Sequence, residues 1–376
     1  MFGRQIHLFR LFGFSVGIDL SWLIIAVLIT WSLAKGLFPE FLKGLPATTY
    51  WAMGVVGALG LFASIVVHEF AHSLVARRYG LRIRGITLFI FGGVAQMEDE
   101  PPTPMAEFMT AVAGPIASVL IAGFCLVLAL FGALAGLPEP VVGVLVYLGV
   151  INGILVAFNL VPAFPLDGGR VLRSILWHLR GNLRWATRIT TMFGSAFGFL
   201  LIGLGILSFI GGDTWGGIWW FLMGLFLRGA AQSSYQQLLV RRALEGEPLA
   251  RFVQPDVRTV PPSITLQELV NDYVYRYHFK MFPVVDEDRL VGCITTRAVK
   301  EVPHDLWARH TVADVAEPCS EENTIDLGAD AIDALGKMHR NGASRLIVVD
   351  QGRLRGVISL KDLLRLISLK LELEEG

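Results

Sequence analysis

Cysteine and charge are both scarce in this sequence. Its 376 residues include 3 cysteines, Cys125, Cys293 and Cys319, which are far apart and form no CxxC pair. This spacing argues against a disulfide framework and against a zinc site made of thiolates. Charged residues make up 17% of the chain, and 32 Lys and Arg balance 32 Asp and Glu. No nucleic-acid partner is expected, because binding phosphates requires an excess of basic side chains.

Hydrophobic residues, by contrast, make up 53% of the chain and predict a large membrane part. The first apolar run follows basic residues, as in a signal peptide, but it lacks a clear cleavage site and should be retained. The last run is short, and Arg228 interrupts it. The six apolar runs that are candidates for membrane spans are 20–33, 51–76, 108–134, 141–161, 189–210 and 215–227.

Two further patterns describe the membrane part. Residues 82–97 alternate weakly between apolar and polar and contain several glycines, which predicts a β-hairpin or a re-entrant loop. Arginines gather at alternate ends of the apolar runs, whereas the opposite loops contain only Lys35 and Lys43. By the positive-inside rule, we expect a multi-pass protein of the cell membrane with both termini in the cytoplasm.

The second apolar run contains the sequence His68-Glu69-Phe70-Ala71-His72. Residues four apart lie on one face of an α-helix, so both imidazoles can bind the same metal ion. This spacing is typical of a zinc site in which the glutamate is a general base and not a ligand. Ionisable groups are costly in an apolar span, which favours a metal site over buried structural histidines.

A catalytic zinc site needs a third protein ligand, and Asp167 is the strongest candidate. It stands beside Gly168 and Gly169 after the fourth apolar run, at a depth that should match that of His68. The other histidines fall in loops or in the polar C-terminal part. The alternative is a solvated turn, since Asp-Gly is a common turn dipeptide.

From about residue 243 the composition becomes that of a soluble domain, and an internal repeat begins. Residues 284–295 match residues 348–359 at a constant offset of 64. Each copy has two short β-branched strands across a polar turn and follows a helical stretch. We therefore expect one domain at 1–242 and a second at 243–376, with two α/β repeats at about 250–303 and 311–370 that pack on each other.

Together, these features resemble the site-2 protease family of intramembrane zinc metalloproteases, in the branch with cystathionine-β-synthase-type (CBS) domains. The resemblance rests on His68-Glu69-x-x-His72, on Asn159-x-x-Pro162-x-x-x-x-Asp167-Gly168, and on residues 91–95, 100–104 and 113–115 between them. It implies about six transmembrane helices with a re-entrant β-hairpin, followed by a cytosolic α/β tandem CBS domain.

The resemblance also implies the roles of the site residues. His68, His72 and Asp167 would bind one zinc ion, and Glu69 would be the general base. Asn159 would position substrate or stabilise the oxyanion, with a helix-end hydrogen bond as its structural alternative. The implied activity is hydrolysis of a peptide bond within or near a transmembrane segment of a membrane-tethered protein, which would pair with the hairpin. The alternative function is a CBS-regulated transporter or channel without protease activity.

Tandem CBS domains often form a cleft for an adenine nucleotide, so the resemblance implies ATP, ADP or AMP as a regulatory ligand. In the second copy, Ser359 offers a hydroxyl for phosphate and Asp362 a carboxylate for the ribose. The first copy keeps the hydroxyl at Thr295 but has Ala298 where the carboxylate belongs. We expect at most one good nucleotide site per chain and a homodimer through the CBS domains. The alternative is that these domains only dimerise.

Overall fold

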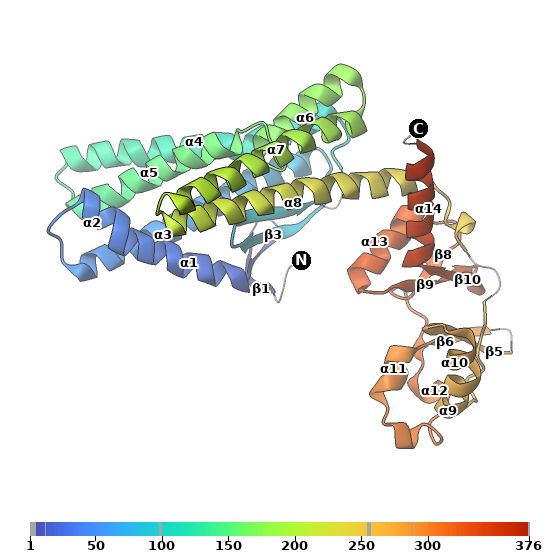
Figure 1. The fold of residues 1–376 in the computed structure, drawn as a ribbon. Helices are drawn as coiled ribbons and strands as arrows, with labels where there is room; N and C mark the ends of the chain where they lie inside the picture. Colours follow the sequence, from blue (N-terminus) through green and yellow to red (C-terminus); the bar gives the residue numbers. More distant parts are fainter. Residues whose placement is uncertain (1–4, 12, 98–99, 254–256, 288, 375–376) are drawn as a thin grey trace. The chain divides into compact units, whose positions relative to one another are not determined.

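The structure is a computed structural model, and it describes residues 5–11, 13–97, 100–253, 257–287 and 289–374. Contacts within the chain divide it into two compact units, Met1–Gln236 and Gln237–Gly376 (Figure 1). Helix α8 (Thr214–Leu244) begins in the first unit and ends in the second. The domain boundary expected near residue 243 falls in the last turn of this helix, and it stays a prediction.

Long apolar helices make up most of the first unit. Their outer side chains include Leu120, Phe124 and Phe131 of α4, which are all more than half exposed, as expected of residues that face lipid. Among the described residues, five helical segments are long and apolar enough to cross a membrane: Leu20–Phe41, which comprises α1 (Leu20–Ser32), the π-helix Leu33–Leu37 and α2 (Phe38–Phe41), then α3 (Ala47–Arg78), α4 (Pro104–Leu134), α5 (Glu139–Asn159) and α7 (Leu183–Ile210).

These segments overlap the first five predicted spans, whereas the sixth lies in α8, which is not among them. Helix α8 nevertheless packs closely on α7 through glycines. A Cβ added to Gly198 would lie 2.8 Å from the carbonyl oxygen of Gly224, and one added to Gly205 would lie 2.7 Å from that of Gly217. Small residues at such contacts are typical of helices packed within a membrane. Six spans therefore remain a prediction.

The first unit also contains one small sheet, with strand order β1-β2-β3-β4. Strands β3 (Ile83–Phe89) and β4 (Gly92–Met97) are antiparallel, which confirms the predicted hairpin, although its insertion into the membrane stays a prediction. The sequence interpretation missed β1 (Gln5–Leu11) and β2 (Phe14–Asp19), which are antiparallel to each other. Strand β2 also pairs with β3 in parallel. Phe14, Val16 and Ile86 of the sheet pack on Phe70 of α3, so the sheet covers this helix beside its two histidines.

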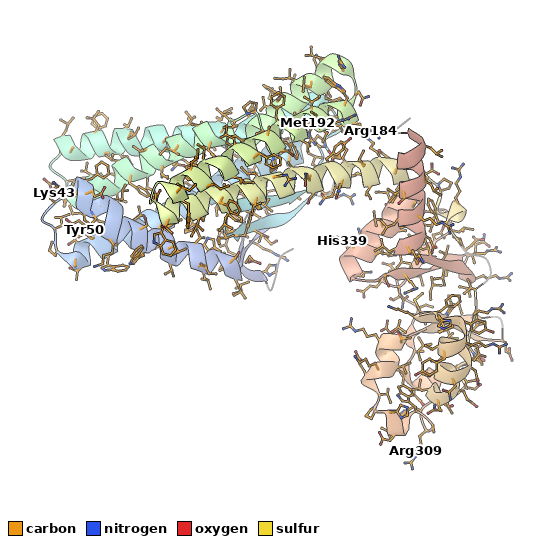
Figure 2. All side chains as sticks on the ribbon, viewed as in Figure 1. Lys43, Tyr50, Arg184, Met192, Arg309 and His339 are labelled. Carbon is orange, nitrogen blue, oxygen red and sulfur yellow. The ribbon has the colours of Figure 1, made fainter. Side chains whose placement is uncertain are left out.

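Helix ends in the first unit follow local capping rules. Thr103 accepts a hydrogen bond from the N–H of Ala106, and Pro104 occupies the first turn, so α4 begins there. The short helix α6 (Asp167–Arg180) ends at Gly181, which has the left-handed φ of 65° that glycine adopts at low cost. Lys43 and Arg184 lie at opposite ends of the helices (Figure 2), but the side that faces the cytoplasm stays a prediction.

The second unit contains two similar sheets. Hydrophobic residues join them, since Met281 and Cys293 of the first sheet pack with Ile347 of the second. The sheets comprise β5 (Met281–Asp286), β6 (Arg289–Thr295) and β7 (Glu317–Pro318), and then β8 (Thr324–Asp326), β9 (Arg345–Asp350) and β10 (Arg353–Ser359). The helices are α9 (Leu266–Glu268), α10 (Tyr275–Tyr277), α11 (Thr296–Glu301), α12 (Val312–Val315), α13 (Ala331–Asn341) and α14 (Leu360–Glu374), with a π-helix at Leu269–Val274 and 3-10 turns at Leu249–Arg251 and His304–Leu306. The repeated strand pairs are confirmed.

Candidate metal centre

His68 and His72 lie one turn apart on the same face of α3. Both are buried, with exposed fractions of 7% and 3%. Their Nε2 atoms are 3.0 Å apart, and their ring planes are inclined at 78°. The helical spacing of the motif therefore brings both ring nitrogens to one point, as the sequence predicts.

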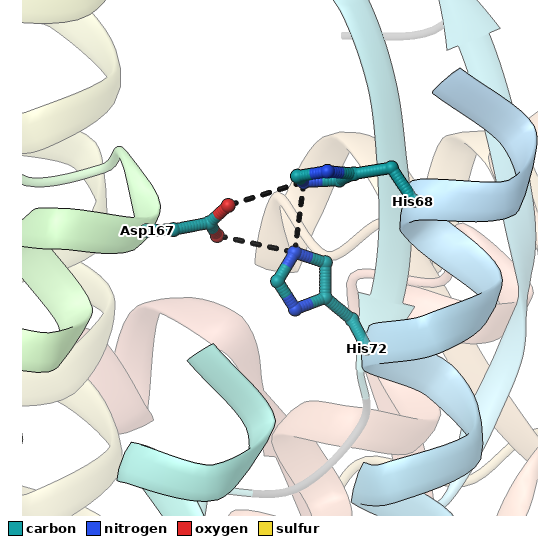
Figure 3. A group of neighbouring side chains, drawn as sticks. All are labelled: His68, His72 and Asp167. Carbon is teal, nitrogen blue, oxygen red and sulfur yellow. Dashed lines mark hydrogen bonds and ion pairs between the residues drawn. The ribbon is translucent and has the colours of Figure 1, made fainter. Parts of the chain in front are cut away.

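Asp167 joins the two histidines from another helix. It is the first residue of α6, and its carboxylate faces both imidazoles (Figure 3). Its Oδ2 lies 3.1 Å from Nε2 of His68, and its Oδ1 lies 3.2 Å from Nε2 of His72. Only 8% of Asp167 is exposed. The alternative of a solvated turn residue is therefore wrong.

Helix α4 holds the outer nitrogens of both imidazoles. The Nδ1–H of His72 donates to the backbone carbonyl of Thr110 at 2.6 Å. A carbonyl can only accept, so the proton of a neutral His72 is on Nδ1 and the lone pair of Nε2 points toward Asp167. The Nδ1 of His68 lies 2.9 Å from the hydroxyl of Ser118. Such outer contacts orient imidazoles that bind a metal.

Glycine at position 114 leaves the space beside both Nε2 atoms open. A Cβ added to Gly114 would lie 2.2 Å from Nε2 of His72 and 2.5 Å from Nε2 of His68. Real Cβ atoms do not approach this closely, so an alanine here would displace the imidazoles or occupy the space between them. Thr110, Gly114 and Ser118 are four residues apart, which places all three on the face of α4 toward the histidines.

Two glycines after Asp167 let α6 start directly against the preceding loop. A Cβ on Gly168 would lie 2.2 Å from the carbonyl oxygen of Leu160, and one on Gly169 would lie 2.3 Å from the backbone nitrogen of Phe164. Any side chain at either position would push the start of α6 away from this loop. The glycines thereby bring Asp167 within reach of α3.

The electrostatics of Asp167 favour its charged form. Burial raises its pKa, but the imidazoles of His68 and His72 that face the carboxylate outweigh that effect and hold the pKa below its ordinary value. The N-terminus of α6 also favours a negative charge at its first residue. Asp167 is therefore a carboxylate at neutral pH, which is the form that binds a metal ion.

The three side chains fit a zinc ion. Ligand atoms 2.0–2.1 Å from a tetrahedral zinc lie about 3.3 Å from one another. The two Nε2 atoms are 3.0 Å apart, and each lies within 3.2 Å of a different carboxylate oxygen of Asp167. Nitrogen and carboxylate oxygen are both usual zinc ligands. In the part of the chain that the structure describes, this is the one group of three His, Cys, Asp or Glu side chains close enough to hold a metal.

Glu69 and Asn159 lie outside this group of three. Glu69 is partly buried and points toward the hairpin, since a Cβ added to Gly93 of β4 would lie 2.9 Å from its Cγ. Asn159 is the last residue of α5 and is partly buried. The expected role of Asn159 stays a prediction.

Thr110 and Ser118 were missed by the sequence interpretation, although their spacing around Gly114 on an apolar helix was a signal that could have found them.

The three candidate nucleotide residues are all helix caps in the structure. The hydroxyl of Thr295 accepts from the N–H of Ala298 at the start of α11. The carboxylate of Asp362 accepts from the N–H of Ser359 at 3.0 Å and from its hydroxyl at 2.5 Å, at the start of α14. These hydrogen bonds give the three side chains a structural role whether or not a nucleotide binds.

Family models and relatives match both units of the chain. The model for peptidase family M50 matches residues 56–143 and 134–202, and the model for the CBS domain matches 249–305 and 312–369. A candidate zinc metalloprotease of Synechocystis sp. is 34% identical over 367 residues, which cover 96% of this chain and 95% of that protein. Zinc metalloprotease MJ0392 of Methanocaldococcus jannaschii is 30% identical over 371 residues, or 99% of this chain and 98% of that protein. The solved site-2 protease from the same organism is 30% identical, covers 61% of this chain and 94% of that chain, and has a TM-score of 0.43.

Replacement of Gly114 by alanine should remove zinc from the purified protein. The added methyl group would occupy the space beside the two Nε2 atoms, so the metal and the imidazoles could not keep their positions. Gly123→Ala is the matched control, because it lies on the same helix and its added Cβ meets nothing within 4 Å. Elemental analysis of both variants measures zinc per chain. Full zinc content in Gly114→Ala would contradict the position of the site.

Proposed function

The chain belongs to peptidase family M50, the site-2 protease family of zinc metalloproteases, and we propose that it hydrolyses a peptide bond within or near a transmembrane segment of a membrane-tethered protein. The observation that carries this proposal is the buried group of His68, His72 and Asp167, with Glu69 beside it on a helix long enough to span a membrane. We further propose that the metal group lies within the membrane, nearer its cytoplasmic side, and that the CBS domains are cytoplasmic.

In this proposal, His68 and His72 hold zinc through Nε2, and Asp167 holds it through its carboxylate. Zinc held there would supply Lewis acidity, which polarises a carbonyl and makes water a better nucleophile at neutral pH. Glu69 takes a proton from the attacking water as the bond from oxygen to the carbonyl carbon forms. It then gives that proton to the leaving amine as the C–N bond breaks. Asn159 positions the substrate or stabilises the oxyanion.

The hairpin offers a place for the substrate backbone. The sheet ends at β4, and Gly93 of this strand lies against Glu69. A peptide bond in a helix is protected by its own hydrogen bonds, so the substrate must be extended before it can be cut. An extended segment that pairs with β4 would satisfy its backbone groups and would lie beside Glu69.

We also propose that the tandem CBS domains form a homodimer and bind an adenine nucleotide at no more than one good site per chain. Ser359, Asp362 and Thr295 are the residues assigned to that site. Since Ser359 and Asp362 bond to each other, a nucleotide would have to replace or share these contacts. The transporter or channel alternative is not favoured, because the full-length relatives are named as zinc metalloproteases.

Substitution of Glu69 should separate metal binding from catalysis. Glu69→Gln removes the proton acceptor and should slow cleavage of a model membrane substrate on the order of 10²- to 10⁴-fold. Its zinc content should stay that of the wild type, because Glu69 is not in the ligand group. His72→Ala should lose both zinc and activity. Zinc analysis and a cleavage assay on the same samples check this, and either a cleaving Glu69→Gln protein or a zinc-loaded His72→Ala protein would refute the assignment.

The nucleotide proposal is tested by calorimetry with ATP, ADP and AMP on the full chain. Asp362→Ala should weaken binding about tenfold or more, because the ribose loses a charge-assisted hydrogen bond. Asp314→Ala is the matched control, since Asp314 forms a similar capping box with Thr311 at the start of α12. Equal affinity in Asp362→Ala and wild type would exclude this site. No heat with any of the three nucleotides would support the dimerisation alternative.

A further inference from the structure

One face of α4 carries four residues that contact the metal centre or the helix of its third ligand. Thr110 and Ser118 contact the two histidines, and Gly114 lies between them. Glu107 is three residues before Thr110, so it lies on the same face one turn earlier. Glu107 contacts α6, the helix that begins with Asp167.

The partner of Glu107 is Arg173, and the pair is buried. Glu107 has no exposed surface, and Arg173 is 6% exposed. The Nε–H of Arg173 donates to Oε1 of Glu107 at 2.6 Å, and a terminal guanidinium nitrogen also contacts this oxygen. Burial lowers the pKa of Arg173, but the charges of Glu107 and Glu100 outweigh this effect and hold the pKa above its ordinary value. The guanidinium therefore stays charged.

Arg173 also contacts the loop that precedes Asp167. Its guanidinium carbon lies 4.9 Å above the ring of Phe164, and the N–H of Phe164 donates to the carbonyl of Thr190 in α7. One side chain on α6 thus reaches α4 and this loop at once. A guanidinium has fixed donor directions, so it sets the distance and the rotation between the two helices.

A buried ion pair is a poor means of stabilising a fold, because removing both charges from water costs about as much as their attraction returns. A pair of apolar side chains would stabilise the contact between α4 and α6 to a similar extent. Apolar contacts, however, have no preferred direction and tolerate sliding of one helix along the other. The directed contact is therefore expected to matter for position more than for stability.

We propose that the Glu107–Arg173 pair is a positioning device for the metal centre. It aligns α6 with the same helix that orients both imidazoles, so that the Asp167 carboxylate meets the two Nε2 atoms at the observed distances. Glu107 and Arg173 do not touch metal or substrate and act through Asp167 and His72. This inference rests on the proposed zinc site of the preceding section.

The test compares three variants of the full-length protein in detergent. Arg173→Met leaves the buried Glu107 without its partner. Glu107→Leu/Arg173→Met removes both charges of the buried pair. It leaves only Glu100, which lies 3.8 Å from the guanidinium and has a side chain that is 34% exposed, without this partner. Arg251→Met is the control for loss of an ion pair away from the metal centre, because it breaks an exposed pair with Glu247 that is 2.7 Å long and lies in the second unit. The measurements are thermal unfolding, zinc affinity by competition with a chelator, and the visible absorption of bound cobalt(II), which depends on ligand geometry.

We expect zinc affinity to fall about 10- to 100-fold in both Arg173→Met and the double variant, the usual cost of removing a partner that orients a metal ligand. The cobalt spectrum should change in both. The double variant should recover the thermal stability that Arg173→Met loses, but it should not recover zinc affinity. Arg251→Met should match the wild type in zinc affinity and in spectrum.

If Arg173→Met does not fold, the double variant alone carries the test. Wild-type zinc affinity and cobalt spectrum in a folded double variant would overturn the proposal, because the pair would then act on stability alone. Failure of the proposed function looks different. If wild-type protein itself binds no zinc, or binds it equally in His72→Ala, the zinc site is wrong and the positioning role falls with it.

Discussion

Two imidazoles and one carboxylate are buried among apolar helices, and their polar atoms need partners there. The neighbouring helices supply these partners. Helix α4 offers the Thr110 carbonyl and the Ser118 hydroxyl to the outer nitrogens. The inner nitrogens face Asp167, as Figure 3 shows. This requirement explains why a glycine occupies position 114 and why α6 begins where it does.

In the proposed reaction, the substrate lies on the side of the centre where Glu69 meets β4. Glu69 does not join the three ligand side chains but points toward β4, at the end of the sheet. A general base must be free to exchange protons, so it cannot also be held as a ligand. The hairpin and the metal group therefore meet at Glu69, where a bond would be cut in the proposed reaction.

Features that follow from a periodic sequence pattern could be predicted from the sequence. Tertiary contacts without such a pattern could not. The histidines follow from helical spacing, and the strands of the second unit follow from a pattern that occurs twice. Strands β1 and β2 were missed, because residues 5–19 precede an apolar run and resemble the basic start of a signal peptide. The bond from His72 to the Thr110 carbonyl has no sequence signature, since every residue has a carbonyl. The pairing of Glu107 with Arg173, 66 residues apart, depends on how the helices pack.

Two histidine nitrogens and a carboxylate hold zinc in the proposed site, and X-ray absorption at the zinc edge of the purified protein can observe these ligands. We expect one zinc per chain with nitrogen and oxygen ligands only, at about 2.0–2.2 Å. That first shell should disappear in Asp167→Ala/His72→Ala protein. A sulfur ligand at about 2.3 Å, which would point to Cys125, Cys293 or Cys319, or a first shell unchanged in the double variant, would contradict it.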